Sequence, residues 1–415
     1  MTAATSATTS DVPERPTAVQ RHRRSLPHGF LAARPLRPLR TVWFWPALAT
    51  LALGLYRLAA PALRRDELAA LTVAHLPGHV ILARLQDADA VRGTYYLFLH
   101  YWITVSGDSP TVLRLPTVLA MAGAAACVAL AGRRMFTPRA GVTGGLVFAL
   151  IPNVTRYGQE ARSYAFVVLG AAAAVVLLLR ALEKPTVLRW LGYGLCVTAV
   201  TYVHPVALAV LGAHAFGVLL AWSRRPDRRL PVGFALASAA GAAAVHPLIQ
   251  LGRAQSGHQL AGIVRPDAGA VWPQIFGSTP TAAAVFLAAA LAWGSGRSRA
   301  VLFGTAAAAL PVLAIWAVSL NTRVSYFTPE CLLFVLPAWA VLAGAGIALL
   351  RPRGIVAGLL ALAVLALPEH YAMHRESSHA RYIPPPPAAE ALAARYKVAS
   401  VDHVSGISVA LLVRR

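Results

Sequence analysis

Acidic residues and lysine are scarce in this sequence. Of 415 residues, 16 are Asp or Glu and 38 are Lys or Arg, and only Lys184 and Lys397 are lysines. Charged residues make up 13% of the chain and hydrophobic residues 57%, whereas soluble domains carry roughly 25% charged residues. This composition excludes an ordinary soluble domain and predicts an all-α polytopic membrane protein. The preference for Arg and Ala suggests a GC-rich bacterial genome.

Cysteine is also rare, with three residues in the chain. Cys127, Cys196 and Cys331 all lie within or beside apolar segments, and their separations fit no metal-ligand spacing. We expect them to pack in the protein core, without a disulfide framework.

The net charge of +22 comes from short clusters of Arg that separate apolar runs. No motif of an RNA- or DNA-binding protein accompanies them, so we expect no nucleic-acid partner. Such clusters are typical of the cytoplasmic loops of membrane proteins. They therefore serve as markers of topology.

The chain divides into three parts. Residues 1–40 are rich in Thr, Ser, Pro and Arg and predict a disordered basic cytoplasmic tail. Residues 41–368 predict a transmembrane domain, and residues 369–415 a small extracytoplasmic cap that ends in an alternating, strand-like run. The Arg clusters accommodate about eleven spans and place the C-terminus outside: 42–60, 111–131, 140–153, 162–181, 187–203, 205–222, 231–250, 275–294, 299–319, 328–350 and 354–368.

The first predicted outer loop, residues 61–110, is long and contains juxtamembrane helices. Its segment 94–105 ("TYYLFLHYWITV") is apolar but short for a crossing, which needs roughly 20 residues. We expect it to lie at the interface or to re-enter the membrane. If it crosses, every later segment changes sides.

Asp66 and Glu67 stand next to each other in "LRRDELAALTVAHLPGH", directly after the first span. Carboxylates at a membrane boundary are costly unless they face water, a cation or a cavity. A solvated surface loop explains them equally well, with Arg64 and Arg65 as local partners. The pair is therefore a candidate site that needs support from elsewhere in the chain.

A second polar stretch, "RYGQEARSYA" at 156–165, lies on the same predicted side. If it is helical, Gln159 and Ser163 share one face and Glu160 and Tyr164 another, because residues four apart are neighbours. Arg162 falls between them. An interfacial belt of Arg and Tyr is the alternative interpretation.

Two further groups lie near predicted outer ends. His204 and His246 each precede a proline, and two histidines without an acid are too few for a metal site. We expect a helix cap or a headgroup contact there. In "NTRVSYFTPE", Arg323 and Tyr326 lead into a late span, where Arg323 matters only if an anion binds outside.

Taken in order, these motifs resemble those of the C-type glycosyltransferase superfamily. The matching elements are an Arg-rich acidic motif at 64–67, "YYLFLHYW" at 95–102, "RLP" at 114–116, "QEARSYA" at 159–165 and "RVSYFTP" at 323–329. The chain is similar to bacterial relatives of protein O-mannosyltransferases and of lipid A aminoarabinose transferases, over residues 43–350. It departs from them in lacking a proline pair before Tyr95 and in separating Arg323 from Tyr326.

The resemblance implies a polyprenyl-phosphate sugar donor, with mannose as the default sugar, and an acceptor hydroxyl on a lipid, glycan or protein at the outer face. Arg suits the phosphate, and a carboxylate suits the acceptor proton. Asp66 is then the general base of an inverting displacement, with Glu67 and Glu160 in supporting roles. The implied substrate-binding residues are Arg65, Tyr95, Tyr96, His100, Gln159, Arg162, Tyr164, His204, Arg323 and Tyr326.

Two questions stay open at this level. Asp66, Glu67 and Glu160 could hold a divalent metal through oxygen ligands, although the resemblance implies no metal or other cofactor. A transporter or lipid flippase with acidic gating residues is the alternative function. Transport predicts charged residues near the bilayer midplane and internal repeats, whereas these acids cluster at predicted helix ends.

Overall fold

The computed structural model describes residues 42–259, 269, 271–321, 325–375, 396–404 and 407–414. The predicted tail at 1–40, Arg323 and most of the C-terminal segment before residue 396 lie outside the described residues.

The described chain is built of helices followed by one hairpin of strands. In chain order, the helices before the site loop at 159–163 are α2 (Phe44–Leu55), α3 (Arg65–Ala74), α4 (Gly78–Asp87), η1 (Ala90–Arg92), α5 (Gly93–Ser106), α6 (Pro110–Met135), α7 (Pro138–Leu150) and α8 (Pro152–Gly158). Those after it are α9 (Tyr164–Glu183), α10 (Val187–Val203), η2 (Pro205–Ala209), α11 (Val210–Trp222), α12 (Arg229–Gln259), α13 (Val271–Phe276), α14 (Thr279–Leu291), η3 (Ala292–Ser295), α15 (Ser298–Asn321), α16 (Pro329–Leu332), η4 (Leu333–Val335), α17 (Leu336–Ile347) and α18 (Pro352–Arg375).

The predicted all-α polytopic class is confirmed, and the chain is a multi-pass membrane protein. A helix falls on each predicted span. In the described residues, 7 helices are long and apolar enough to cross a membrane, and α2, α10 and α14 with η3 are shorter apolar helices. The number of spans that cross stays a prediction.

Local sequence signals set several helix ends. Ser109 and Thr137 cap α6 and α7 through their side chains, and a proline follows each cap at the first helical position. The predicted span at 140–153 ends earlier, at Leu150, because Pro152 cannot continue the helix and starts α8 instead.

The helices of the central bundle pack closely through small residues. A Cβ on Gly344 of α17 would collide with the backbone of Gly144 of α7, so only glycines allow this approach. Thr143 also donates its hydroxyl to the Gly344 carbonyl at 2.7 Å. Small residues that bring backbones together, with hydroxyl hydrogen bonds between helices, are typical of membrane helix packing.

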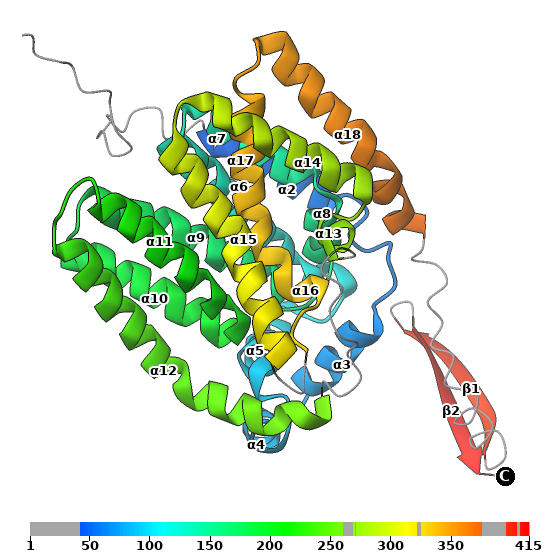
Figure 1. Ribbon diagram of the computed structural model, residues 1–415. Coiled ribbons are helices and arrows are strands. Elements are labelled where there is room, and N and C mark those ends of the chain that lie inside the picture. The colour runs from blue at the N-terminus through cyan, green and yellow to red at the C-terminus, as the bar shows by residue number, and fades with distance from the viewer. Residues whose placement is uncertain are drawn as a thin grey trace, which may run out of the picture.

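The loop after α2 forms its own small structure. Figure 1 shows α3, α4 and α5 together at one end of the helix bundle. They enclose a separate apolar cluster that includes Ile81, Tyr95, Leu99 and Ala161. The predicted juxtamembrane helices are thus present. The 14 residues of α5 extend about 21 Å, which is short of a membrane core of about 30 Å.

The run predicted as one strand forms two. β1 (Tyr396–Val404) pairs antiparallel with β2 (Ile407–Arg414), with Val401 opposite Ala410 and an irregularity between Val398 and Ser400. The all-α description therefore holds for the membrane part only.

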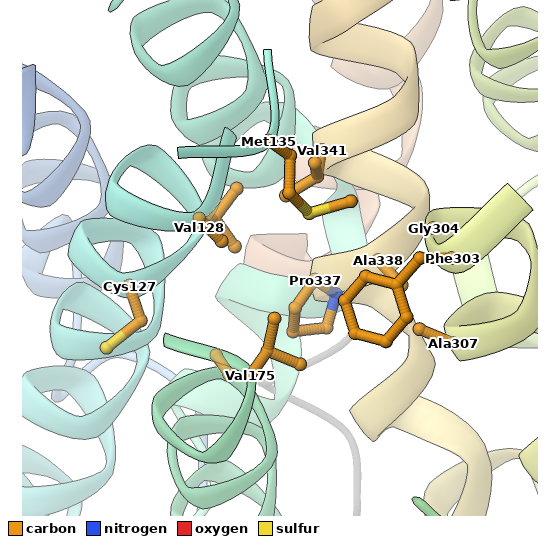
Figure 2. Close-up of a pocket in the computed structure, with 12 residues that line it drawn as sticks. Cys127, Val128, Met135, Val175, Phe303, Gly304, Ala307, Pro337, Ala338 and Val341 are labelled. Carbon is orange, nitrogen blue, oxygen red and sulfur yellow. The ribbon is translucent and has the colours of Figure 1, made fainter. Parts of the chain in front are cut away.

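A small cavity lies inside the bundle, between α6, α9, α15 and α17. Figure 2 shows its apolar lining, which includes Cys127, Val175, Phe303 and Pro337. Its volume of about 20 Å³ is roughly that of one water molecule. None of the predicted site residues lines it, so it is not a site for a sugar.

Candidate active site

Asp66 lies in the first turn of α3, where the helix dipole favours a carboxylate. Its side chain is 60% exposed, and Oδ2 accepts a hydrogen bond from Nη1 of Arg162 at 2.9 Å. Among the described residues, Oδ1 has no hydrogen-bond partner. The first loop and the α8–α9 connection are therefore joined at a carboxylate that is still open to solvent.

Glu67, the next residue, is buried, with 1% of its side chain exposed. Oε1 and Oε2 accept from Nε and Nη2 of Arg114, both at 2.9 Å. The backbone N–H groups of Ala161 and Arg64 also donate to this carboxylate, at 2.8 and 2.9 Å. With four donors, Glu67 ties α3 to α6 and to the α8–α9 connection.

The partner Arg114 is a residue that the sequence reasoning passed over. It is 1% exposed, and it also donates to the carbonyls of Leu58, Pro61 and Ala62 at 2.8–3.1 Å. These carbonyls follow α2, so Arg114 fixes the start of the loop. The sequence did show a charged residue in the apolar segment that begins "RLP", which could have marked Arg114 as important. It gives no indication of the residues that Arg114 contacts.

The connection between α8 and α9 is not helical, so the shared faces that a helix at 156–165 would give do not form. α8 ends at Gly158 and α9 begins at Tyr164. In the turn between them, Glu160 accepts from Nη1 of Arg64 at 3.2 Å and from Nη1 of Arg162 at 3.3 Å. Ionic contacts across the loop, rather than helical spacing, bring these side chains together.

Arg162 is the centre of this network. Nη1 donates to Asp66 and Glu160, and Nη2 donates to the Tyr164 hydroxyl at 3.1 Å. The guanidinium carbon lies 4.7 Å from the centre of the Tyr164 ring, within the range of a cation–π contact. A planar group with several donors suits this set of contacts, and an ammonium would not reproduce it.

Glu160 is almost fully enclosed, with 4% of its side chain exposed. Burial raises the pKa of its carboxyl group above the usual value, despite Arg64 and Arg162 beside it. The group is therefore closer to changing its charge near neutral pH than an exposed glutamate is.

Gln159 is buried and faces the end of α2. Its Nε2 donates to the carbonyls of Gly54 and Tyr56 at 2.9 and 2.8 Å. These contacts satisfy carbonyls that a helix leaves unpaired in its last turn. The structure thus places both amide hydrogens of Gln159 on the protein backbone.

A second cation faces the same region. Arg92 closes η1 and pairs with Asp89 at 3.3 Å, with half of its side chain exposed. Arg92 and Arg162 both act electrostatically on Tyr164 and His204. Arg92 was not among the predicted site residues. Its signal was a positive charge three residues before the double tyrosine.

His204 links α10 to η2, where its Nδ1 accepts from the N–H of Val206 at 3.3 Å. The expectation of a helix-capping histidine is confirmed. Its ring centre lies 6.1 Å from that of Tyr164. Burial lowers the pKa of His204 to about 4, and the charges of Arg92 and Arg162 add to this effect, so the ring is neutral at neutral pH.

Three predicted aromatic residues lie on the small cluster under the loop. Tyr95 and Tyr96 are buried in it, and Tyr95 packs against Phe166 of α9. Burial raises the pKa of Tyr95 well above its usual value, and Glu67 and Glu160 add to this effect. His100 contacts the carbonyl of Ala74 through Nδ1 at 2.8 Å, which anchors α5 to the end of α3.

The other predicted residues are not brought into the network. Arg65 is exposed and, among the described residues, pairs with none of the acids. Tyr326 is half-buried against the main core, and its backbone N–H donates to Ser319 at 3.0 Å. Arg323 lies outside the described residues.

The contacts of the three acids also determine whether their oxygens are available to a metal ion. Glu67 uses its oxygens for Arg114 and for two backbone N–H groups, while Asp66 and Glu160 share Arg162. In the part of the chain that the structure describes, no group of three His, Cys, Asp or Glu side chains could hold a metal ion.

The helical fold of this chain is similar to that of ArnT. Two crystal structures of ArnT from Cupriavidus metallidurans, one bound to undecaprenyl phosphate and one in the apo state, superpose with TM-scores of 0.56 and 0.54 at 17% and 18% sequence identity. The matches cover 78% and 77% of this chain and 63% and 62% of ArnT. The chain thus spans less than two thirds of ArnT.

The sequence comparison gives a second relation. The model of the family described as dolichyl-phosphate-mannose-protein mannosyltransferase matches residues 94–250. No curated protein matches the chain. The resemblance to C-type glycosyltransferases inferred from the sequence motifs is confirmed by the family match and by the shared fold.

Proposed function

We propose that this chain is a membrane glycosyltransferase that moves a sugar from a polyprenyl-phosphate donor to an acceptor hydroxyl. The observation that carries the proposal is the Asp66–Arg162 pair, in which an exposed carboxylate adjoins a cation within hydrogen-bond distance. Acceptor chemistry needs the carboxylate, and a lipid-phosphate leaving group needs the cation.

In the reaction we propose, Asp66 is the general base. The acceptor oxygen bonds to the anomeric carbon as the bond from that carbon to the phosphate oxygen breaks, with inversion. The acceptor proton passes to Asp66, whose side chain is exposed, and the lipid phosphate leaves with the bonding electrons.

Arg162 and Arg92 are the proposed phosphate-binding cations. Arg162 is held by Glu160 and Tyr164, so its position is set before the donor binds. His204 is neutral and can contribute a ring N–H without another positive charge. Arg323 is the further cation that the resemblance implies.

The proposed location of the site is the extracytoplasmic face. α6 begins near the site with Arg114 and ends with Arg133 and Arg134, while α9 begins beside the site and ends at Glu183. The Arg-rich helix ends therefore lie opposite the site. Because cytoplasmic loops carry excess Arg and Lys, this arrangement supports a site on the outer face and an N-terminus inside.

A transfer assay tests the proposal. Proteoliposomes with the wild-type chain, Asp66→Asn or Asp108→Asn are supplied with radiolabelled polyprenyl-phosphate mannose and with lipid and protein acceptors. We expect Asp66→Asn to lower transfer at least about 100-fold. Asp108→Asn, an exposed acid paired with His75, should leave transfer unchanged. Equal transfer by Asp66→Asn and wild type would exclude Asp66 as the base, and lipid movement without transfer would favour the transporter alternative.

A further inference from the structure

One amide side chain near the end of α12 bridges the turn between α4 and η1. Gln255 accepts from the N–H of Ala90 at 2.9 Å, and its Nε2 donates to the carbonyls of Leu85 and Gln86 at 3.0 and 3.1 Å. Gln255 itself is 8% exposed. All three partners lie more than 160 residues away in sequence, so the contact exists only in the folded protein.

The turn that Gln255 bridges has little support of its own. Leu85 and Gln86 belong to the last turn of α4, where helix carbonyls have no partner within the helix. Asp89 adopts a positive φ of 60°, which non-glycine residues rarely adopt. The Gln255 side chain supplies hydrogen bonds on both sides of this bend.

A second contact fastens η1 to α12. A Cβ on Gly252 would lie 2.7 Å from Cγ2 of Val91 in η1. The absence of a side chain at Gly252 thus lets Val91 pack directly on α12. One turn further along the helix, Gln255 completes the attachment.

The segment fastened in this way ends in Arg92. Arg92 is half exposed and pairs with Asp89, and it lies close enough to Arg162 for the two positive charges to repel. Like charges held near each other separate unless the backbone fixes them or an anion lies between them. The attachment of η1 to α12 provides the backbone restraint.

We propose that Gln255 is a positioning residue for the lipid-phosphate donor: through η1 it holds Arg92 in the region of Arg162, so that α12 sets the affinity for the phosphate. This inference rests on the proposed function, because Arg92 and Arg162 are taken there as the phosphate-binding cations. Gln255 touches neither the donor nor the reacting atoms.

Binding of undecaprenyl phosphate, measured without turnover on the detergent-solubilised full chain, tests the inference. We expect Gln255→Ala to weaken binding roughly tenfold, because a displaced Arg92 would lose about one hydrogen bond to the charged phosphate. Gln250→Ala is the matched control, since Gln250 is an exposed glutamine on the same helix that contacts only His246 at 3.3 Å among the described residues. It should bind as wild type does.

A double-variant comparison separates positioning from general destabilisation. If Gln255 acts through Arg92, then Gln255→Ala should add nothing to the loss caused by Arg92→Gln, because the side chain that it positions is already gone. Additive losses would overturn the inference. Gly252→Ala perturbs the same attachment by a different route, and it should weaken binding even if Gln255→Ala does not fold.

The outcomes also distinguish a failure of the proposed function from a failure of the role proposed for Gln255. If the wild-type chain does not bind undecaprenyl phosphate, the proposed donor is wrong and the inference falls with it. If wild type binds and both Gln255→Ala and Gly252→Ala bind equally well, the inference alone is wrong. In the supporting result, the variants also show a raised KM for donor with an unchanged kcat.

Discussion

Asp66 and Glu67 are adjacent in the chain, yet their side chains lie in opposite environments, 60% and 1% exposed. Asp66 meets Arg162 at the surface, whereas Glu67 is enclosed by Arg114 and two backbone N–H groups. The helical turn at the start of α3 separates them, because successive side chains on a helix point about 100° apart. One acid is thus available for chemistry and the other holds the loop in place.

Glu67→Gln should destabilise the protein. The change leaves the guanidinium of Arg114 buried without its counter-ion, and removing one partner of a buried pair costs about 3–5 kcal/mol. A thermal melt in detergent would show a lowered melting temperature. Asp66→Asn is the control, because loss of an exposed ion pair costs about 0–1 kcal/mol. Equal melting temperatures for the two variants would contradict the structural role of Glu67.

Arg162→Lys should impair donor use although it keeps the charge. A lysine cannot reach Asp66, Glu160 and Tyr164 together, so the cation loses its fixed position. We expect kcat/KM to fall at least about tenfold, which corresponds to about 1.4 kcal/mol. Arg65→Lys, a change at an exposed arginine at the start of α3, should have no effect. If Arg162→Lys kept the wild-type rate, the planar, multi-donor geometry of the guanidinium would not be required for the reaction.

Glu160→Gln should change how donor KM depends on pH. Burial raises the pKa of Glu160, so wild-type Glu160 takes up a proton at a higher pH than an exposed glutamate and then loses its ionic hold on Arg162. We expect the wild-type KM to rise as the pH falls from 7.5 toward 5. Glu160→Gln should show that higher KM already at pH 7.5 and vary less over the same range. Parallel profiles for the two proteins would exclude Glu160 as the titrating group.

His204 should make stability depend on pH. Its pKa is about 4 in the folded protein and 6.5 for the ordinary group, so between these values the unfolded chain binds a proton that the folded chain does not. Stability therefore falls as the pH drops through this window. Melts at pH 7.5 and 4.5 should show a larger loss for wild type than for His204→Gln. His79→Gln, at an exposed histidine on α4, should behave as wild type.

The helical architecture could be predicted because the hydrophobicity of each apolar stretch, taken alone, indicates that it lies in lipid. A helix falls on each of the segments chosen from hydropathy and Arg clusters, from α2 to α18. The pattern could not show that the last alternating run forms the two strands β1 and β2, since strand pairing depends on contacts between two parts of that run. The sequence did not predict the end of α7 at Leu150, which is explained by the proline at position 152 that starts α8.

The candidate site was predicted less completely. The order of motifs pointed to Asp66, Glu160 and Arg162, and the structure joins these three side chains. The motifs named Asp66 as the base, but they could not show that Glu67 is buried, because its burial depends on Arg114, which is 47 residues further along the chain. Arg92 and Gln255 were missed for the same reason, since their importance comes from contacts formed only when distant helices meet.

The glycine contact between α7 and α17 has a mechanical consequence. Because Gly144 and Gly344 bring two backbones into direct contact, and Thr143 bonds across them, α7 and α17 cannot slide without breaking that contact. The two helices therefore move as one rigid unit. By contrast, little of α12 is buried within the protein, 11% in its apolar window, so α12 has no comparable lock along most of its length.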